Sequence, residues 1–161
     1  MAETATLLVA DDDPAVRQSL ERTLAREGYT VVLAPDGHAA IDRLRGGGID
    51  LVLSDLRMPG LNGLELLREV KTISPDLDVI MLTAFGTVEE AVRAMKDGAV
   101  DFLTKPFQRA QLVRVIRKAL ERRALIQENK ALQQRLDALL AQGAGDQAGG
   151  GGLHRRGGGG T

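Results

Sequence analysis

Short apolar blocks alternate with longer segments of helical periodicity along most of the chain. Five blocks rich in Leu, Val, Ile and Ala predict strands, and the apolar residues between them recur every three or four positions, which predicts helices. The predicted strands are residues 6–10, 29–34, 50–54, 78–84 and 99–104. The first, third and fourth blocks are apolar throughout, which is typical of strands that helices cover on both faces.

This alternation of strands and helices predicts the α/β fold class. It favours a doubly wound, five-stranded parallel sheet with the flavodoxin-like order 2-1-3-4-5. Helix ends carry recognisable signals. Asp13 and Pro14 predict an N-cap and a first helical position, and Gly28 predicts the end of that helix. Thr87 and Glu90 predict a capping box at the start of a later helix.

The last helix, predicted to begin near Gln108, continues well past the length that can pack on a sheet. Residues 121–142 keep a heptad pattern, with leucine at the d positions and one asparagine at an a position. The d positions are Leu125, Leu132 and Leu139, and the a positions are Asn129 and Leu136. A single asparagine at position a fixes the register of two-stranded coiled coils, so the pattern favours pairing of two chains. A solvated amphipathic linker is the alternative.

The chain therefore divides into three predicted parts. Residues 1–123 form the α/β domain, residues 124–142 form the amphipathic linker helix, and residues 143–161 form a Gly-rich tail that cannot bury enough surface to order itself.

Composition excludes several classes of protein. Of the 161 residues 43% are hydrophobic and only 2% are aromatic, so the core must consist mostly of aliphatic side chains. The formal net charge of -1 gives no basic field for nucleic acid, and we expect no direct nucleic-acid binding. No apolar run approaches the length of a membrane helix, and the N-terminus has no secretory signal. The absence of cysteine fits a reducing compartment, so a cytoplasmic location is expected.

Residues that handle phosphate follow four of the predicted strands. They are an acidic cluster (Asp11, Asp12, Asp13), a single acid (Asp55), a hydroxyl (Thr83) and an amine (Lys105). Because the carboxyl ends of parallel strands share one edge, these groups are expected to meet there. A pair of carboxylates is a ligand set for Mg²⁺, and a carboxylate beside that cation can act as a nucleophile toward a phosphoryl group.

The motifs LLVADDDP, LVLSDLRMPG, IMLTAFG and VDFLTKPF, in this order and spacing, resemble the receiver domain of two-component response regulators, with its CheY-like fold. The resemblance covers residues 5–123 or so and assigns the following roles. Asp11 and Asp12 would bind Mg²⁺ together with Asp55 and the backbone carbonyl of Arg57, and Asp55 would accept the phosphoryl group. Lys105 would pair with the bound phosphoryl group. Thr83 would be the switch hydroxyl and Phe102 the switch aromatic. The longer stretches around Asp55 and Thr83 resemble the NtrC-type subgroup.

The resemblance also implies a function. A sensor histidine kinase would donate the phosphoryl group to Asp55, and the face made by the fourth and fifth helices and the strand between them would change. This face and the 108–142 helix would form a homodimer that controls an output domain. That domain is expected to act in transcription and is not part of these residues. The chain would not be a classical enzyme, because it would only phosphorylate itself from a donor with Mg²⁺ and slowly lose the group.

Two other interpretations remain open on sequence. Asp11 and Asp13 fit the Asp-x-Asp pattern of haloacid-dehalogenase-type phosphatases, as nucleophile and acid, although this leaves Asp55 without a role. A receiver-like interaction module that is never phosphorylated is the third interpretation, and the complete set of acids, Thr83 and Lys105 argues against it.

Overall fold

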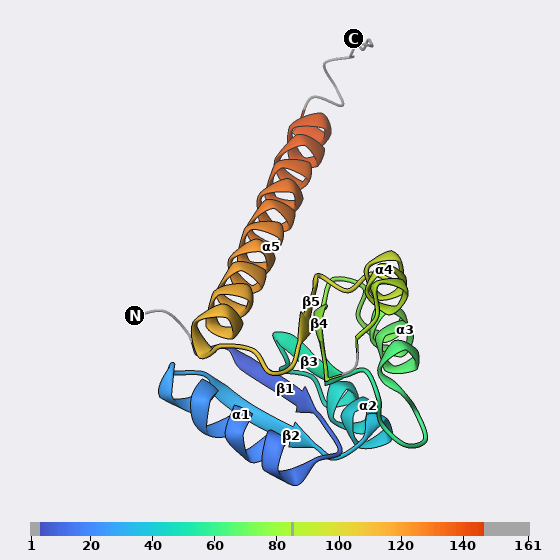
Figure 1. Cartoon of the computed structure of the whole chain (residues 1–161). Coiled ribbons are helices and arrows are strands. Elements are labelled where there is room, and N and C mark those ends of the chain that lie inside the picture. The colour runs from blue at the N-terminus through green and yellow to red at the C-terminus, as the bar shows by residue number, and fades with distance from the viewer. Residues whose placement is uncertain (1–3, 85, 147–161) are drawn as a thin grey trace. The chain divides into compact units, whose positions relative to one another are not determined.

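The computed structural model describes residues 4–84 and 86–146, in which five strands alternate with five helices (Figure 1). The elements are β1 (Thr6–Ala10), α1 (Pro14–Arg26), β2 (Thr30–Ala34), α2 (Gly37–Arg45), β3 (Leu51–Asp55), α3 (Gly63–Ile73), β4 (Asp78–Thr83), α4 (Val88–Lys96), β5 (Asp101–Thr104) and α5 (Arg109–Asp146). The chain separates into two compact units, Met1–Arg123 and Ala124–Thr161, and α5 contributes residues to both.

The strands form one parallel sheet in the order β2-β1-β3-β4-β5, which confirms the predicted topology. β1 and β3 are neighbours, with Ala10 opposite Ser54, so the residues after β1 lie beside the end of β3. β3 runs one residue further than the sequence pattern suggested, and Asp55 is its last residue. The fourth predicted block ends one residue earlier, so Thr83 is the last residue of β4. The acid, the hydroxyl and the loop after β1 thus reach the same edge.

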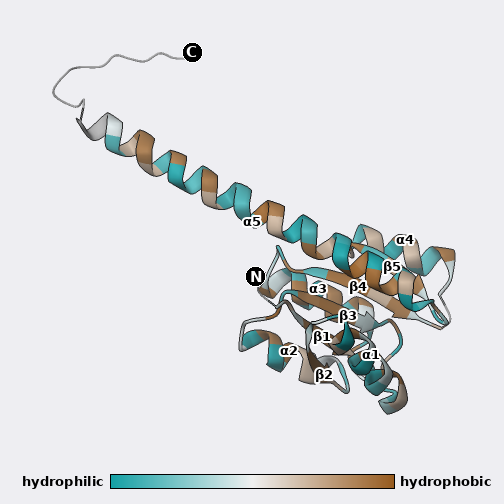
Figure 2. Cartoon of the chain, turned by 90° about the vertical axis from the view of Figure 1, so that its left-hand side faces the viewer, coloured by the Kyte–Doolittle hydropathy of each residue, from teal (hydrophilic) through white to brown (hydrophobic). Residues whose placement is uncertain are grey.

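Successive side chains of the central strands enter two separate hydrophobic layers, as the alternation of a strand requires. Leu7, Val9, Leu53 and Ile80 face one layer, and Leu8, Ala10, Val52 and Met81 face the other. The first layer is closed by Leu20 and Leu24 of α1 with Leu112 and Ile116 of α5, and the second by Ile41 of α2, Leu66 of α3 and Ala94 of α4. Figure 2 shows the strands as a largely brown band between helices that carry teal residues. Burial on both faces fixes the sheet and therefore the positions of the strand ends.

Helix starts follow the predicted signals. Asp13 caps α1 by accepting the Ala15 N–H, with Pro14 as the first helical residue, and Thr87 and Glu90 form the capping box of α4. Gly28, with φ of +93°, ends the turn after α1 in a conformation that favours glycine. A second capping box, Asn62 with Glu65 at α3, was not predicted.

The part of α5 that belongs to the first unit is fixed to the sheet. Leu112, Ile116 and Ala119 are buried, and the Arg122 guanidinium lies 3.2 Å from an oxygen of Asp78, a carboxylate buried at the start of β4. This contact anchors the helix to the edge of the sheet opposite the predicted site.

The part of α5 in the second unit continues to Asp146 rather than ending at Gln142. Its heptad leucines are exposed, from 48% for Leu132 to 64% for Leu139, and Figure 2 shows brown positions recurring along it. Most of the predicted tail, residues 147–161, lies outside the described residues. Within the residues that the structure describes, no helix is both long and apolar enough to cross a membrane.

Candidate phosphoacceptor site

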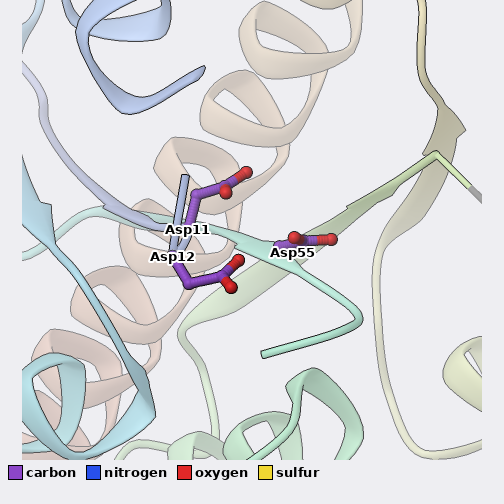
Figure 3. Close-up of side chains that lie close together, drawn as sticks. All are labelled: Asp11, Asp12 and Asp55. Carbon is purple, nitrogen blue, oxygen red and sulfur yellow. The ribbon is translucent and has the colours of Figure 1, made fainter. Parts of the chain in front are cut away.

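Three carboxylates meet at the carboxyl edge of the sheet. Asp11 and Asp12 follow β1 and Asp55 ends β3, and one oxygen from each lies within 4.8 Å of the others. Figure 3 shows the three side chains gathered at the strand ends, and they differ in exposure. Asp11 and Asp55 are buried, whereas Asp12 is exposed and opens the group to solvent. The three carboxylates that were predicted from the sequence to bind a metal therefore lie side by side in the structure.

Lys105 supplies the positive charge of this site. Its Nζ lies 2.7 Å from Oδ2 of Asp11 and 3.8 Å from Oδ2 of Asp55. The Lys105 N–H donates to the carbonyl of Thr83, which continues the pairing of β5 with β4 past the strand ends. The Lys105–Pro106 peptide bond is cis. The ammonium thus lies between the two buried acids, where it reduces their mutual repulsion.

The electrostatic environment of Asp55 is set by opposing effects. Burial raises the pKa of the Asp55 carboxyl above its ordinary value, and the Asp11 and Asp12 carboxylates raise it further. The Lys105 ammonium and the Arg57 N–H, which is 3.4 Å from Oδ1 of Asp55, lower this pKa. Among the three causes that favour the protonated form, burial is the largest. A cation beside this carboxylate would favour its ionised form, which is the nucleophilic one.

Thr83 and Phe102 lie on the neighbouring strands β4 and β5. Thr83 is buried as the last residue of β4, and Phe102 is partly buried and packs against the second core layer. Gly86 connects them, since a Cβ added there would lie 2.7 Å from Cε1 of Phe102 and 2.9 Å from Cγ2 of Thr83. The absence of a side chain at Gly86 therefore allows the loop after β4 to touch both residues.

The side chains of two arginines near the acids were not predicted to take part, since the sequence pointed only to the backbone carbonyl of Arg57. The Arg17 guanidinium donates to the backbone carbonyl of Asp11 at 2.6 Å, and the Arg57 guanidinium pairs with Glu90 at 2.7 Å. A signal for Arg17 was present, because a long side chain in the first turn of a helix points back toward the helix N-terminus. No signal in the sequence places Arg57 beside Glu90, which is 33 residues away.

The donor set fits a hard divalent cation. The acids present oxygen ligands, Asp12 is open to solvent as a cation that retains several waters requires, and the site lies at the switch point of the sheet. Asp13 does not join the group, because its exposed carboxylate caps α1. This removes the acid that the phosphatase interpretation requires.

A parallel sheet of order 2-1-3-4-5, with three acids and a lysine at its carboxyl edge, is the arrangement expected of a phosphoacceptor module. The model of the response regulator receiver domain family matches residues 7–117, so this chain belongs to the response regulator receiver domain family. The family assignment from sequence is thereby confirmed.

Individual relatives agree with the NtrC-type subgroup. The C4-dicarboxylate transport transcriptional regulatory protein DctD of Rhizobium meliloti is 37% identical over 138 residues, which are 86% of this chain and 30% of DctD. A crystal structure of NtrX from Brucella abortus in complex with ADP has a TM-score of 0.76 and 36% identity, covering 81% of this chain and 30% of that one. A solution structure of the beryllofluoride-activated NtrC4 receiver domain dimer has a TM-score of 0.71 and 33% identity, and the match covers 73% of this chain and 98% of that one. The chain thus spans about a third of the longer regulators that it matches.

Proposed function

We propose that Asp55 accepts a phosphoryl group from a sensor histidine kinase, with Mg²⁺ as cofactor, and that this modification controls an output domain. The observation that supports the proposal is the meeting of Asp55 with two further acids and with Lys105 at one edge of the sheet. Family membership supports the same role. Under this proposal the chain is a phosphorylated signalling protein of the cytoplasm rather than a classical enzyme.

The residues of the chain divide the work of phosphoryl transfer. Asp11, Asp12, Asp55 and the backbone carbonyl of Arg57 would hold Mg²⁺, which supplies neutralisation of the charge that develops on the transferred group. An oxygen of Asp55 attacks the phosphorus of the donor, and the bond from phosphorus to the phosphohistidine nitrogen breaks with its electron pair going to that nitrogen. Lys105 then shares its ammonium between Asp11 and the phosphoryl oxygens, which it can do because it already lies within 3.8 Å of Asp55.

The phosphorylated site would act on the loop after β4. New acceptor oxygens on Asp55 would attract the Thr83 hydroxyl. Gly86 and Phe102 would move with Thr83, because Gly86 lies against both side chains. The neighbouring surface of α4 exposes Val88, Val92 and Met95, so a displacement of α4 changes an apolar face. This is how a local charge would reach an output domain.

A comparison of two acid variants tests the phosphoacceptor function. The full chain is incubated with acetyl phosphate and Mg²⁺, and incorporation is followed by intact mass and by sensitivity of the acyl phosphate to hydroxylamine. Asp55→Asn is expected to lose incorporation completely, whereas Asp42→Asn, an exposed acid on α2, keeps the wild-type rate. Incorporation that persists in Asp55→Asn and disappears in Asp11→Asn would instead support the phosphatase interpretation.

We further propose that two copies pair through the heptad positions of α5 beyond Arg123. Support comes from the exposure of Leu125, Leu132 and Leu139 along a described helix, and one matched structure is a receiver dimer. Sedimentation should show a dimer for the wild type and a monomer for Leu132→Lys. The control Gln134→Lys adds the same charge two positions away, off the a and d positions, and should remain dimeric. A wild-type monomer would refute the pairing.

A further inference from the structure

An ion pair connects the phosphoacceptor loop with the start of α4. Arg57 follows Asp55 by two residues in the loop between β3 and α3, and its Nη2 lies 2.7 Å from Oε2 of Glu90. The Arg57 side chain is 54% exposed and that of Glu90 is 25% exposed. The pair therefore joins two segments whose relative position the proposed function requires to change.

Glu90 uses both of its oxygens. Its Oε1 accepts the N–H of Thr87 at 3.2 Å, and its own N–H donates to Oγ1 of Thr87 at 3.0 Å, which closes the capping box. Its Oε2 is the partner of Arg57. The Glu90 carboxylate thus fixes the first turn of α4 and at the same time attaches that turn to Arg57 in the loop between β3 and α3. A displacement of the first turn of α4 away from β3 that exceeds the reach of the Arg57 side chain breaks the ion pair.

Arg57 is also the cation best placed to reach a phosphoryl group on Asp55 from the β3–α3 loop. Its backbone N–H already lies 3.4 Å from Oδ1 of Asp55. A guanidinium binds phosphate oxygens in a bidentate manner and more strongly than an exposed carboxylate, because two parallel charge-assisted hydrogen bonds form. A hollow of about 410 Å³, lined by Leu56, Met58, Asn62 and the two members of the pair, gives the side chain room to turn.

We propose that the Arg57–Glu90 ion pair holds α4 in its unphosphorylated position and is exchanged for an Arg57–phosphoryl contact when Asp55 is modified. The inference rests on the proposed function and adds a regulatory role for two residues that bind neither the donor nor, through their side chains, the metal. Loss of the pair releases the first turn of α4, and the guanidinium stabilises the phosphorylated state. Phosphorylation and the position of α4 are coupled through this exchange.

Glu90→Gln isolates the ion pair, since glutamine can keep the capping box while the charge that attracts Arg57 is removed. An exposed ion pair is worth a factor of about two to five in an equilibrium, so Glu90→Gln should raise the affinity of the full chain for beryllofluoride with Mg²⁺ by about that factor. Hydrogen–deuterium exchange of residues 86–91, measured without Mg²⁺ or beryllofluoride, should accelerate to a similar degree.

Glu89→Gln is the matched control, because Glu89 is exposed in the same first turn and its removal costs the same favourable interaction with the helix dipole. It should match the wild type in affinity for beryllofluoride, and its exchange should accelerate less than that of Glu90→Gln, because only the dipole interaction is lost. The charge-exchanged variant Arg57→Glu/Glu90→Arg keeps an ion pair but provides no cation for phosphate, and it should bind beryllofluoride more weakly than the wild type.

The outcomes separate the two proposals. A wild-type chain that binds no beryllofluoride would refute the proposed function. A wild type that binds, with Glu90→Gln and Glu89→Gln indistinguishable in affinity and in exchange, would refute the role of the ion pair and leave the phosphoacceptor function standing.

Discussion

A methyl group added at Gly63 should distort the site although no charged side chain is changed. Gly63 is the first residue of α3, and its N–H donates to the carbonyl of Leu56 at 2.9 Å. A Cβ added there would lie 2.4 Å from the carbonyl oxygen of Asp55, 2.6 Å from Cε of Met81 and 2.7 Å from Cα of Leu56. Two of these neighbours are backbone atoms, which cannot turn away as a flexible side chain can.

The magnitude follows from these contacts. Relief requires α3 or the end of β3 to move by several tenths of an ångström, and overpacking of this kind costs about 3 kcal/mol when backbone must shift. The better helix propensity of alanine returns about 1 kcal/mol at most, so Gly63→Ala should lower the free energy of unfolding by about 2 kcal/mol. For a domain of this size that corresponds to a Tm lower by about 8 °C.

Thermal unfolding followed by circular dichroism measures this change, with Gly46→Ala as the control. Gly46 has a right-handed helical conformation, with φ of -74°, and an added Cβ would meet only the carbonyl oxygen and Nη1 of Arg43, at 3.3 and 3.5 Å, so its Tm should stay near that of the wild type. Gly63→Ala should also accept phosphoryl groups more slowly, because the carbonyl that moves belongs to Asp55. Equal Tm values for the two variants would refute the packing argument.

Three further changes probe charge, metal and core. Without Mg²⁺, Asp55→Asn should raise the Tm at neutral pH, because burial raises the pKa of this carboxyl and its ionised form destabilises the folded state. That advantage should shrink as the pH falls through the raised pKa of the folded state towards the ordinary carboxyl value of 3.8, and it should be absent below that value, where both folded and unfolded chains are protonated. An advantage independent of pH would contradict the explanation. Mg²⁺ at about 100 times its Kd should stabilise the wild type by about 2.7 kcal/mol, and Asp12→Ala should lose most of this shift in a thermal titration, whereas an equal shift would exclude Asp12 as a ligand. Ile116→Ala, at a fully buried position of α5, should cost about 2–5 kcal/mol in urea unfolding, and a cost below about 1 kcal/mol would mean that α5 does not close that core layer.

Much of the site was predictable because it depends on strand ends. Asp11, Asp55, Thr83 and Lys105 each follow or end an apolar block, and a parallel sheet brings such positions together without any information on side chains. The fold was predictable for the same reason, since three of the strands show the continuous apolar runs of a sheet covered on both faces.

The contacts that the sequence did not reveal are those between loops and helices. The approach of Gly86 to Phe102 and the pairing of Arg57 with Glu90 depend on how far α4 lies from β3, which no periodicity encodes. The capping box of Asn62 and Glu65 was visible in principle, but the Pro-Gly-Leu-Asn-Gly segment before it reads as a turn. Most element ends differed by one or two residues where the last turn or strand residue depends on pairing, and α5 runs four residues past its predicted end at Gln142.

The distance along the chain between Asp11 and Lys105 has a consequence for biosynthesis. The partners are 94 residues apart, so during translation the buried acid leaves the ribosome long before its ammonium does. A nascent chain that has reached only β4 holds like charges without their counter-ion, and the sheet gains its full stability only after β5 is synthesised. The site therefore acquires its ammonium only after β5 has been synthesised.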